Sequence, residues 1–163
     1  MTIADASMIH EEALGIMLQS VLKHFDQATG VPAETGVPYL LKGDTEMLDV
    51  TAVIGVTGDL QGCIYYTASN LLLDDLLGSV GEKNSADELR CEMCDKVANA
   101  FAGNARRQLG PGFMVSLPVV FMGQPEWLAL PKNTSRYVIP ILWRQKRSLL
   151  IVCLENTPPA PFL

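Results

Sequence analysis

The distribution of apolar residues predicts helices in two parts of the chain and strands over most of the rest. From about Ser7 to Phe25, apolar and small positions return every three or four residues, which is the spacing of a helix with one buried stripe. The members of this stripe are Ile9, Ala13, Ile16, Met17, Ser20, Val21 and His24. Residues 29–38, which hold two glycines and two prolines, predict a loop.

One strand-like segment alternates between apolar and more polar positions. Val50–Thr57 shows this alternation, Gly58-Asp59 turns the chain, and Leu60–Thr67 follows, which predicts an antiparallel hairpin. Further strands are predicted at Phe113–Phe121, near Trp127–Leu130, at Tyr137–Trp143 and, after a turn through Arg144–Arg147, at Leu149–Glu155. Short connections favour antiparallel pairing. The predicted fold class is therefore α+β, with an antiparallel β-sheet covered by long α-helices.

Two more helices are predicted between these groups of strands. Ser69 or Asn70 can cap a short one. A long one starts near Ser85, where Glu88 three residues later completes a capping box, and it runs to about Leu109.

Composition and charge limit the partners that the chain can have. Its 163 residues suit one domain at 1–157, followed by a loose tail at 158–163 whose prolines cannot continue a strand. The net charge of −6 argues against nucleic acid or an anionic membrane as the main partner. The N-terminus lacks the pattern of a signal peptide, and there is no apolar run of about 18 residues, so we expect a cytoplasmic protein.

The four cysteines, at positions 63, 91, 94 and 153, are expected to be thiols that serve in packing. The pair Cys91-x-x-Cys94 has the spacing of a metal or redox motif. A structural zinc site needs four ligands, however, and neither His10 nor His24 is near in sequence. We therefore predict no metal site.

The second long helix has an exposed face that holds the candidate chemistry. On a helical wheel, its core side is formed by Leu89, Met93, Cys94, Val97, Ala98, Phe101 and Ala105. The opposite side presents Glu88, Glu92, Asp95, Asn99, Gly103 and Arg106, with Lys96 at its edge. Asn and Gly are both unfavourable inside a helix, Gly by about 1 kcal/mol relative to Ala. Gly103, with the alanines beside it, leaves a low surface that another protein can approach closely.

The run Val97–Ala105 resembles the signature helix of the CheX/CheC group of bacterial chemotaxis phosphatases, which typically reads Glu-x-x-Asn followed by Ala-Gly-Asn-Ala or a close variant. Asp49–Gly62 resembles the family's hairpin, Ser116–Val120 the strand after the helix, and Tyr137–Glu155 the closing hairpin. The resemblance spans about residues 7–155 in the family's order. The first helix has no Glu-x-x-Asn, so the single-site CheX form fits better than the two-site CheC form.

The resemblance implies a phosphatase that acts on the aspartyl phosphate of a CheY-type response regulator. Asn99 is implied to be the catalytic residue that orients the attacking water, while the partner regulator holds the Mg²⁺ and this chain has no cofactor of its own. The family's Glu is implied to pair with the regulator's active-site lysine, but Lys96 stands at that position. Asp95, one residue away, or Glu92 would then have to take its place.

This replacement leaves two functions open. One is an active phosphatase whose catalytic residues are Asn99 and Asp95, and the other is a catalytically silent domain that binds a regulator or another protein. In both cases the predicted partner-binding residues are Glu92, Lys96, Gly103 and Arg106. The resemblance also implies a homodimer, which would cover the open edges of the strand-rich C-terminal half.

Overall fold

The computed structural model describes residues 3–44, 47–125, 130–131 and 134–158, and of residues 3–10 it describes only the backbone. Three helices are present in this part of the chain: α1 (Ile3–Thr29), α2 (Asn70–Ser79) and α3 (Asp87–Leu109). The strands are β1 (Glu34–Thr35), β2 (Tyr39–Leu40), β3 (Val50–Gly58), β4 (Leu60–Ala68), β5 (Phe113–Val115), β6 (Val119–Met122), β7 (Ser135–Trp143) and β8 (Lys146–Asn156).

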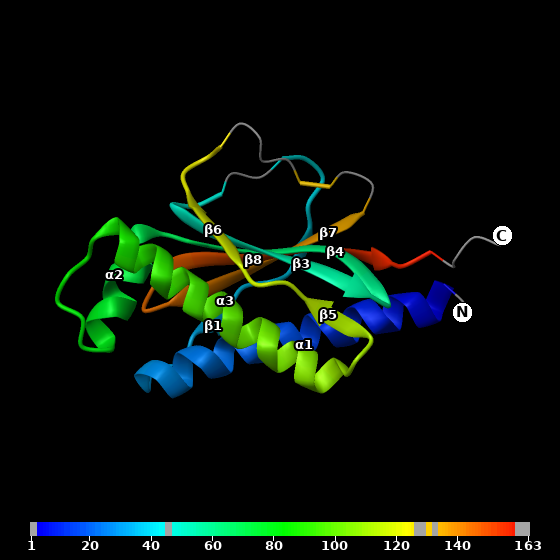
Figure 1. Cartoon of the computed structure of the whole chain (residues 1–163), viewed down its shortest axis with the longest axis horizontal. Coiled ribbons are helices and arrows are strands. Elements are labelled where there is room, and N and C mark those ends of the chain that lie inside the picture. Colours follow the sequence, from blue (N-terminus) through cyan, green and yellow to red (C-terminus); the bar gives the residue numbers. More distant parts are fainter. Residues whose placement is uncertain (1–2, 45–46, 126–129, 132–133, 159–163) are drawn as a thin grey trace.

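The described strands form one sheet in the order β1-β7-β8-β4-β3-β5, with β2 also paired to β7 and β6 also paired to β3. Every pairing among them is antiparallel. The long helices α1 and α3 cross the same face of this sheet, and α2 lies near one end of α3 (Figure 1). The predicted α+β class is confirmed.

Apolar side chains are buried on both faces of the central strands. Because successive strand residues point to opposite faces, Ile64 and Tyr66 of β4 pack into the large core beneath α1 and α3, together with Phe25 and Phe101. Tyr65, between them in sequence, belongs to a smaller cluster on the other face. Burial on both faces explains why residues 149–154 of β8 form a continuous apolar run without alternation.

The predicted first helix is present and is longer at both ends than Ser7–Phe25. It ends where Gly30, at φ 76°, donates its N–H to the carbonyl of Asp26 at 2.8 Å, a left-handed position that favours glycine. Of the two candidate N-caps of α2, Ser69 and Asn70, the structure shows Ser69: its Oγ accepts a hydrogen bond from the N–H of Leu72 at 3.2 Å.

The predicted capping box at Ser85 and Glu88 is wrong. The N-cap of α3 is Ala86, which makes no side-chain cap hydrogen bond, and the helix begins one residue later. Near this start, the guanidinium of Arg90 bonds Asp74 of α2 at 2.7 Å and Asp87 of the first turn at 2.9 Å. This ion pair ties the first turn of α3 to α2, but it does not supply the side-chain acceptor for backbone N–H groups that the capping box was expected to provide.

The predicted strand at 113–121 is wrong as a single element, because it is split into β5 and β6. Val115 pairs with Val56, and Val119 pairs with Val53. Three residues, 116–118, therefore lie opposite only two residues of β3, 54–55, which is the geometry of a β-bulge. Ser116 holds the bulge: its N–H donates to the carbonyl of Gly55 at 2.9 Å, and its Oγ accepts from the N–H of Gly55 at 2.8 Å.

Two smaller predictions also need correction. The loop at 29–38 contains the two-residue strand β1, and the turn predicted at 144–147 is only Arg144-Gln145. Both turn residues have positive φ, 47° and 65°, as a tight two-residue hairpin turn requires. Most of the predicted strand near 127–130, and all of the tail after residue 158, lie outside the described residues.

Candidate functional site

The exposed face of α3 is as the helical wheel predicts. Met93, Val97, Phe101 and Ala105 are buried against the sheet and α1. On the opposite side Glu92, Lys96, Asn99 and Arg106 are exposed, and Asp95 and Gly103 are half-buried. The structure therefore brings together on one helix surface all the residues that the sequence analysis assigned to catalysis and partner binding.

Asn99 lies in the middle of this face with its side chain held in place. Its Nδ2 donates a hydrogen bond to Oδ2 of Asp95, one turn earlier, at 3.2 Å. Within the described part of the chain, the Oδ1 atom of Asn99 has no hydrogen-bond partner. This contact favours the orientation in which the amide oxygen is left to accept a hydrogen bond from a water molecule or a partner protein.

The charged neighbours of Asn99 are not paired with each other. Glu92 precedes Lys96 by four residues, a spacing at which helical ion pairs form. Yet the ion pairs among the described residues involve neither of them. The Lys96 ammonium is consequently an exposed, unneutralised charge one turn from Asn99.

A groove between α1 and α3 opens beside Asn99, and sequence reasoning did not find it. Its volume is about 230 Å³, and Asn99, Ala100 and Gly103 of α3 form part of its wall. The rest of the lining consists of Ser20, Lys23, His24, Gln27, Asn104 and Arg107. Burial lowers the pKa of His24 below its ordinary value, which favours the neutral imidazole. No local pattern predicts this groove, because it depends on how the two helices are aligned along their lengths.

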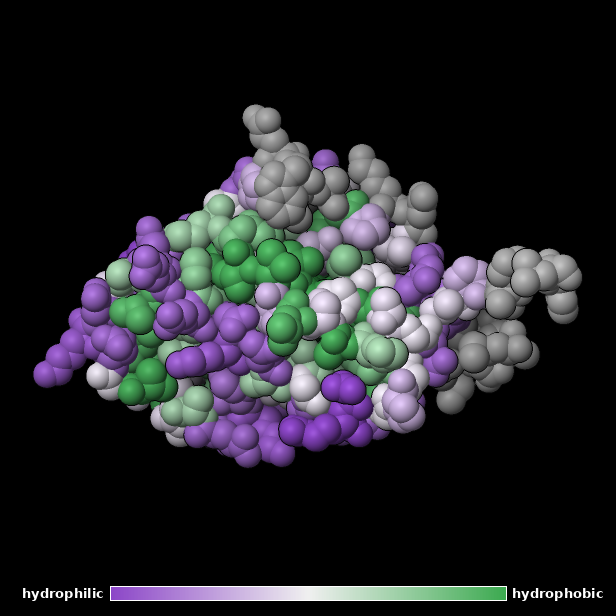
Figure 2. Space-filling model, viewed as in Figure 1, coloured by the Kyte–Doolittle hydropathy of each residue, from purple (hydrophilic) through white to green (hydrophobic). Residues whose placement is uncertain are grey.

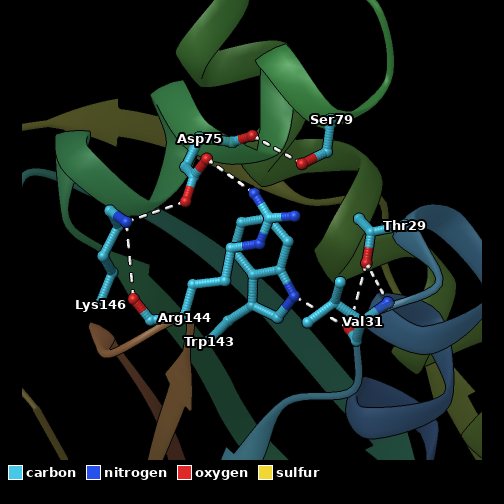
Figure 3. Close-up of polar contacts among 7 residues, drawn as sticks. All are labelled: Thr29, Val31, Asp75, Ser79, Trp143, Arg144 and Lys146. Atoms are coloured by element: carbon cyan, nitrogen blue, oxygen red, sulfur yellow. Dashed lines mark hydrogen bonds and ion pairs between the residues drawn. The ribbon is translucent and has the colours of Figure 1, made fainter.

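The basic turn after Trp143 has a packing role. The Trp143 side chain is fully buried, and its Nε1 donates to the carbonyl of Val31 at 2.9 Å (Figure 3). Arg144 and Lys146 bond the two carboxylate oxygens of Asp75 in α2 at 3.2 and 2.8 Å. The hydrogen bond from Lys146 lowers the pKa of Asp75. These contacts attach the β7–β8 turn to α2.

The cysteines are free thiols in the structure. Burial raises the pKa of Cys94 well above its ordinary value and that of Cys153 to about 12, so both thiols are protonated at neutral pH. Among the described residues, no group of three or more His, Cys, Asp or Glu side chains is arranged to hold a metal ion.

We expect the domain to remain folded in a chelator and in a reductant. If the cysteines serve only in packing, neither EDTA nor dithiothreitol should move the melting temperature, and metal analysis of the purified protein should find no stoichiometric zinc. A melting temperature that falls in EDTA would show instead that Cys91 and Cys94 belong to a metal site.

The fold and the matched sequence define the class of protein. Residues 50–142, more than half of the chain, match the family described as "Chemotaxis phosphatase CheX". The chain belongs to the CheX family. A search among curated proteins gave no match. Within the described residues, no helix has both the length and the apolar character needed to cross a membrane.

Solved structures share this fold. A CheC-like superfamily protein from Shewanella sp. PV-4 has a TM-score of 0.79 and 22% identity, covering 88% of this chain and 97% of that one. The chemotaxis protein CheX from Desulfovibrio desulfuricans has a TM-score of 0.77 and 21% identity, covering 88% and 99%. A third similar chain comes from the CheX–CheY–BeF₃–Mg²⁺ complex of Borrelia burgdorferi, at a TM-score of 0.70 and 19% identity, covering 88% and 97%.

Proposed function

We propose that this domain docks through the exposed face of α3 on a phosphorylated CheY-type response regulator and speeds the loss of its aspartyl phosphate. The observation that carries the proposal is Asn99, an exposed amide at the centre of that face, oriented by Asp95 at 3.2 Å. Membership of the CheX family supports a role with a CheY-type partner, and a CheX–CheY complex is among the similar structures.

The chemistry requires little of this chain beyond position. In hydrolysis of the aspartyl phosphate, the oxygen of a water molecule attacks phosphorus, the bond from phosphorus to the aspartate oxygen breaks, and inorganic phosphate and a free carboxylate result. Asn99 would align that water, and a Mg²⁺ ion held by the regulator would offset charge on the phosphoryl oxygens. Asp95 would act as the positioning residue for the amide. We place this reaction in the cytoplasm.

Asn99→Ala is the test of this function. We expect the variant to lose its acceleration of dephosphorylation, leaving only the regulator's own rate, while its melting temperature stays within a few degrees because the side chain is exposed. Phosphate release from a phosphorylated regulator at catalytic amounts of the domain measures the effect. Asn84→Ala, which removes another exposed amide in the loop before α3, is the matched control.

Lys96 favours a second candidate function. The ammonium stands where the family's helix carries a glutamate, and it is exposed and unpaired within the described part of the chain. A silent domain would bind the phosphorylated regulator without changing its rate of decay, so binding without turnover by the natural protein would select this function. Absence of binding to any regulator of the host would exclude the phosphatase and a silent regulator-binding domain, and would leave a domain that binds another protein.

We also propose that the domain forms a homodimer through the β5–β6 edge of the sheet. Hydrophobic residues gather on the surface where β6 and the segment before it lie (Figures 1 and 2). The exposed ones are Met114, Leu117, Val119 and Met122. An apolar edge strand with open backbone groups readily pairs with another chain.

Val119→Asp should therefore shift the protein from dimer to monomer, because a carboxylate on this edge would have to lose its hydration in the interface. Sedimentation velocity measures the change. Val37→Asp introduces the same charge at an exposed residue between β1 and β2 and should leave the dimer intact. A natural protein that sediments as a monomer at all concentrations would contradict the proposal.

A further inference from the structure

The groove between α1 and α3 is lined on both sides by cationic and polar groups. Lys23 comes from α1 and Arg107 from α3, and the neutral polar side chains around them include Asn99 and Asn104. None of its described lining residues is a carboxylate. Although the chain has a net charge of −6, the charged residues that line this groove, Lys23 and Arg107, are both cations.

Like Lys96, these two cations form no ion pair within the described part of the chain, whereas Arg90, Arg144 and Lys146 each pair with an aspartate. The charge of Lys23 and Arg107 is therefore available to a ligand.

The polar groups of the groove are arranged in advance. The hydroxyl of Ser20, whose residue is only 3% exposed, donates to the carbonyl of Ile16 at 2.7 Å and accepts from Nδ2 of Asn104 at 2.5 Å. The other end of that amide, Oδ1, accepts from Nη2 of Arg107 at 3.4 Å. A chain of hydrogen bonds thus runs from Ser20 to one end of the guanidinium, the last of them long, and leaves the other N–H groups of Arg107 for an additional acceptor.

We propose that this groove binds an oxyanion of the phosphate type, with Lys23 and Arg107 supplying the charge. Guanidinium and ammonium groups form the strongest hydrogen bonds to such oxygens. Two sources can deliver the anion: free inorganic phosphate, or the phosphoryl group of a docked regulator. Binding of the regulator's phosphoryl group rests on the proposed function, whereas binding of free phosphate does not. Since Asn99 forms part of the same wall, an anion held here lies beside the side-chain amide that is proposed to orient the attacking water.

The first experiment uses the whole protein without any regulator. Inorganic phosphate is titrated at constant ionic strength, and ¹⁵N NMR follows the side-chain amides of Asn99 and Asn104. We expect saturable shifts that Lys23→Ala and Arg107→Ala each weaken by about tenfold or more, since each removes a charge-assisted hydrogen bond. Lys83→Ala removes an exposed cation from the loop before α3 and should have no effect.

The second experiment compares the affinity of each variant for phosphorylated and unphosphorylated regulator. If the regulator supplies the anion, Lys23→Ala should reduce the preference for the phosphorylated form, whereas Lys83→Ala should not. Saturable phosphate binding with no regulator binding would support the groove as an oxyanion site and reject the proposed function. The inference is overturned if the amides do not respond to phosphate and the preference is unchanged, or if Lys83→Ala has the same effects as Lys23→Ala.

Discussion

Lys96→Glu is expected to increase the proposed dephosphorylation of a CheY-type regulator by about ten- to a hundredfold. The substitution restores the acid of the Glu-x-x-Asn pattern and replaces a repulsive contact with an attractive one against a regulator lysine. In a partly desolvated interface such an exchange can be worth a few kcal/mol. The Lys96 side chain is exposed and unpaired in the described part of the chain, so no internal contact is lost.

The stability cost of this variant should be small. Glu92 and the glutamate introduced by Lys96→Glu would be like charges four residues apart on α3, which costs about 0.2–0.5 kcal/mol. Urea denaturation should therefore give a free energy of unfolding within about 1 kcal/mol of the natural protein. Lys83→Glu makes the same change of charge away from α3 and should leave the dephosphorylation rate unchanged.

Asp95→Asn tests the companion role of the carboxylate beside Asn99. If Asp95 orients the amide and stands in for the missing glutamate, its neutral variant should lower whatever activity the natural protein has. If Lys96→Glu instead weakens binding to the regulator, the phosphatase proposal is contradicted. The lysine would then contact an acidic group of a partner, and the domain would be an interaction module.

Of the variants considered, Trp143→Ala should destabilise the domain most. It should lower the free energy of unfolding by about 3–5 kcal/mol, as expected when a large aromatic side chain is removed from a packed core. Trp143 is fully buried, its ring centroid is 5.7 Å from that of Phe25 in α1, and its Nε1 bonds the carbonyl of Val31. The same side chain thus connects β7 to the end of α1 and to the segment that follows it.

Trp143→Phe separates the hydrogen bond from the packing. Phenylalanine keeps an aromatic ring but cannot donate to Val31. The Thr29 hydroxyl lies 3.1 Å from the Val31 carbonyl (Figure 3), but its single hydrogen has a closer acceptor in the Phe25 carbonyl at 2.6 Å, so it does not fully replace the indole donor. We expect Trp143→Phe to cost less than half as much as Trp143→Ala, as measured by urea denaturation. Equal costs for the two variants would show that the indole hydrogen bond outweighs the packing.

Local patterns were enough to predict the helix that carries the candidate site. The faces of α3 follow from a spacing of 3.6 residues per turn, so Asn99, Lys96 and Asp95 could be placed on one exposed surface from the sequence alone. The β3–β4 hairpin was predicted for the same reason, since its alternating strands and its turn at Gly58-Asp59 are contiguous in the chain.

The failed predictions involve contacts between distant residues. The bulge at Ser116 exists because its backbone and hydroxyl bond Gly55, 61 residues earlier. The first turn of α3 is tied to α2 by Arg90, which bonds Asp74, 16 residues earlier in the chain. Neither interaction leaves a mark in the local sequence that differs from an ordinary strand or cap.

The sequence by itself determined the fold class, the exposed face of α3 and the family pattern in which Lys96 is the departure. Only the tertiary structure decided what lies beside Asn99. The periodicity of α1 shows which side is buried, but it does not give the position of α1 along α3. That alignment is set by core packing between the two helices and the sheet, and it brings Ser20 to Asn104 and Lys23 into the groove beside Asn99.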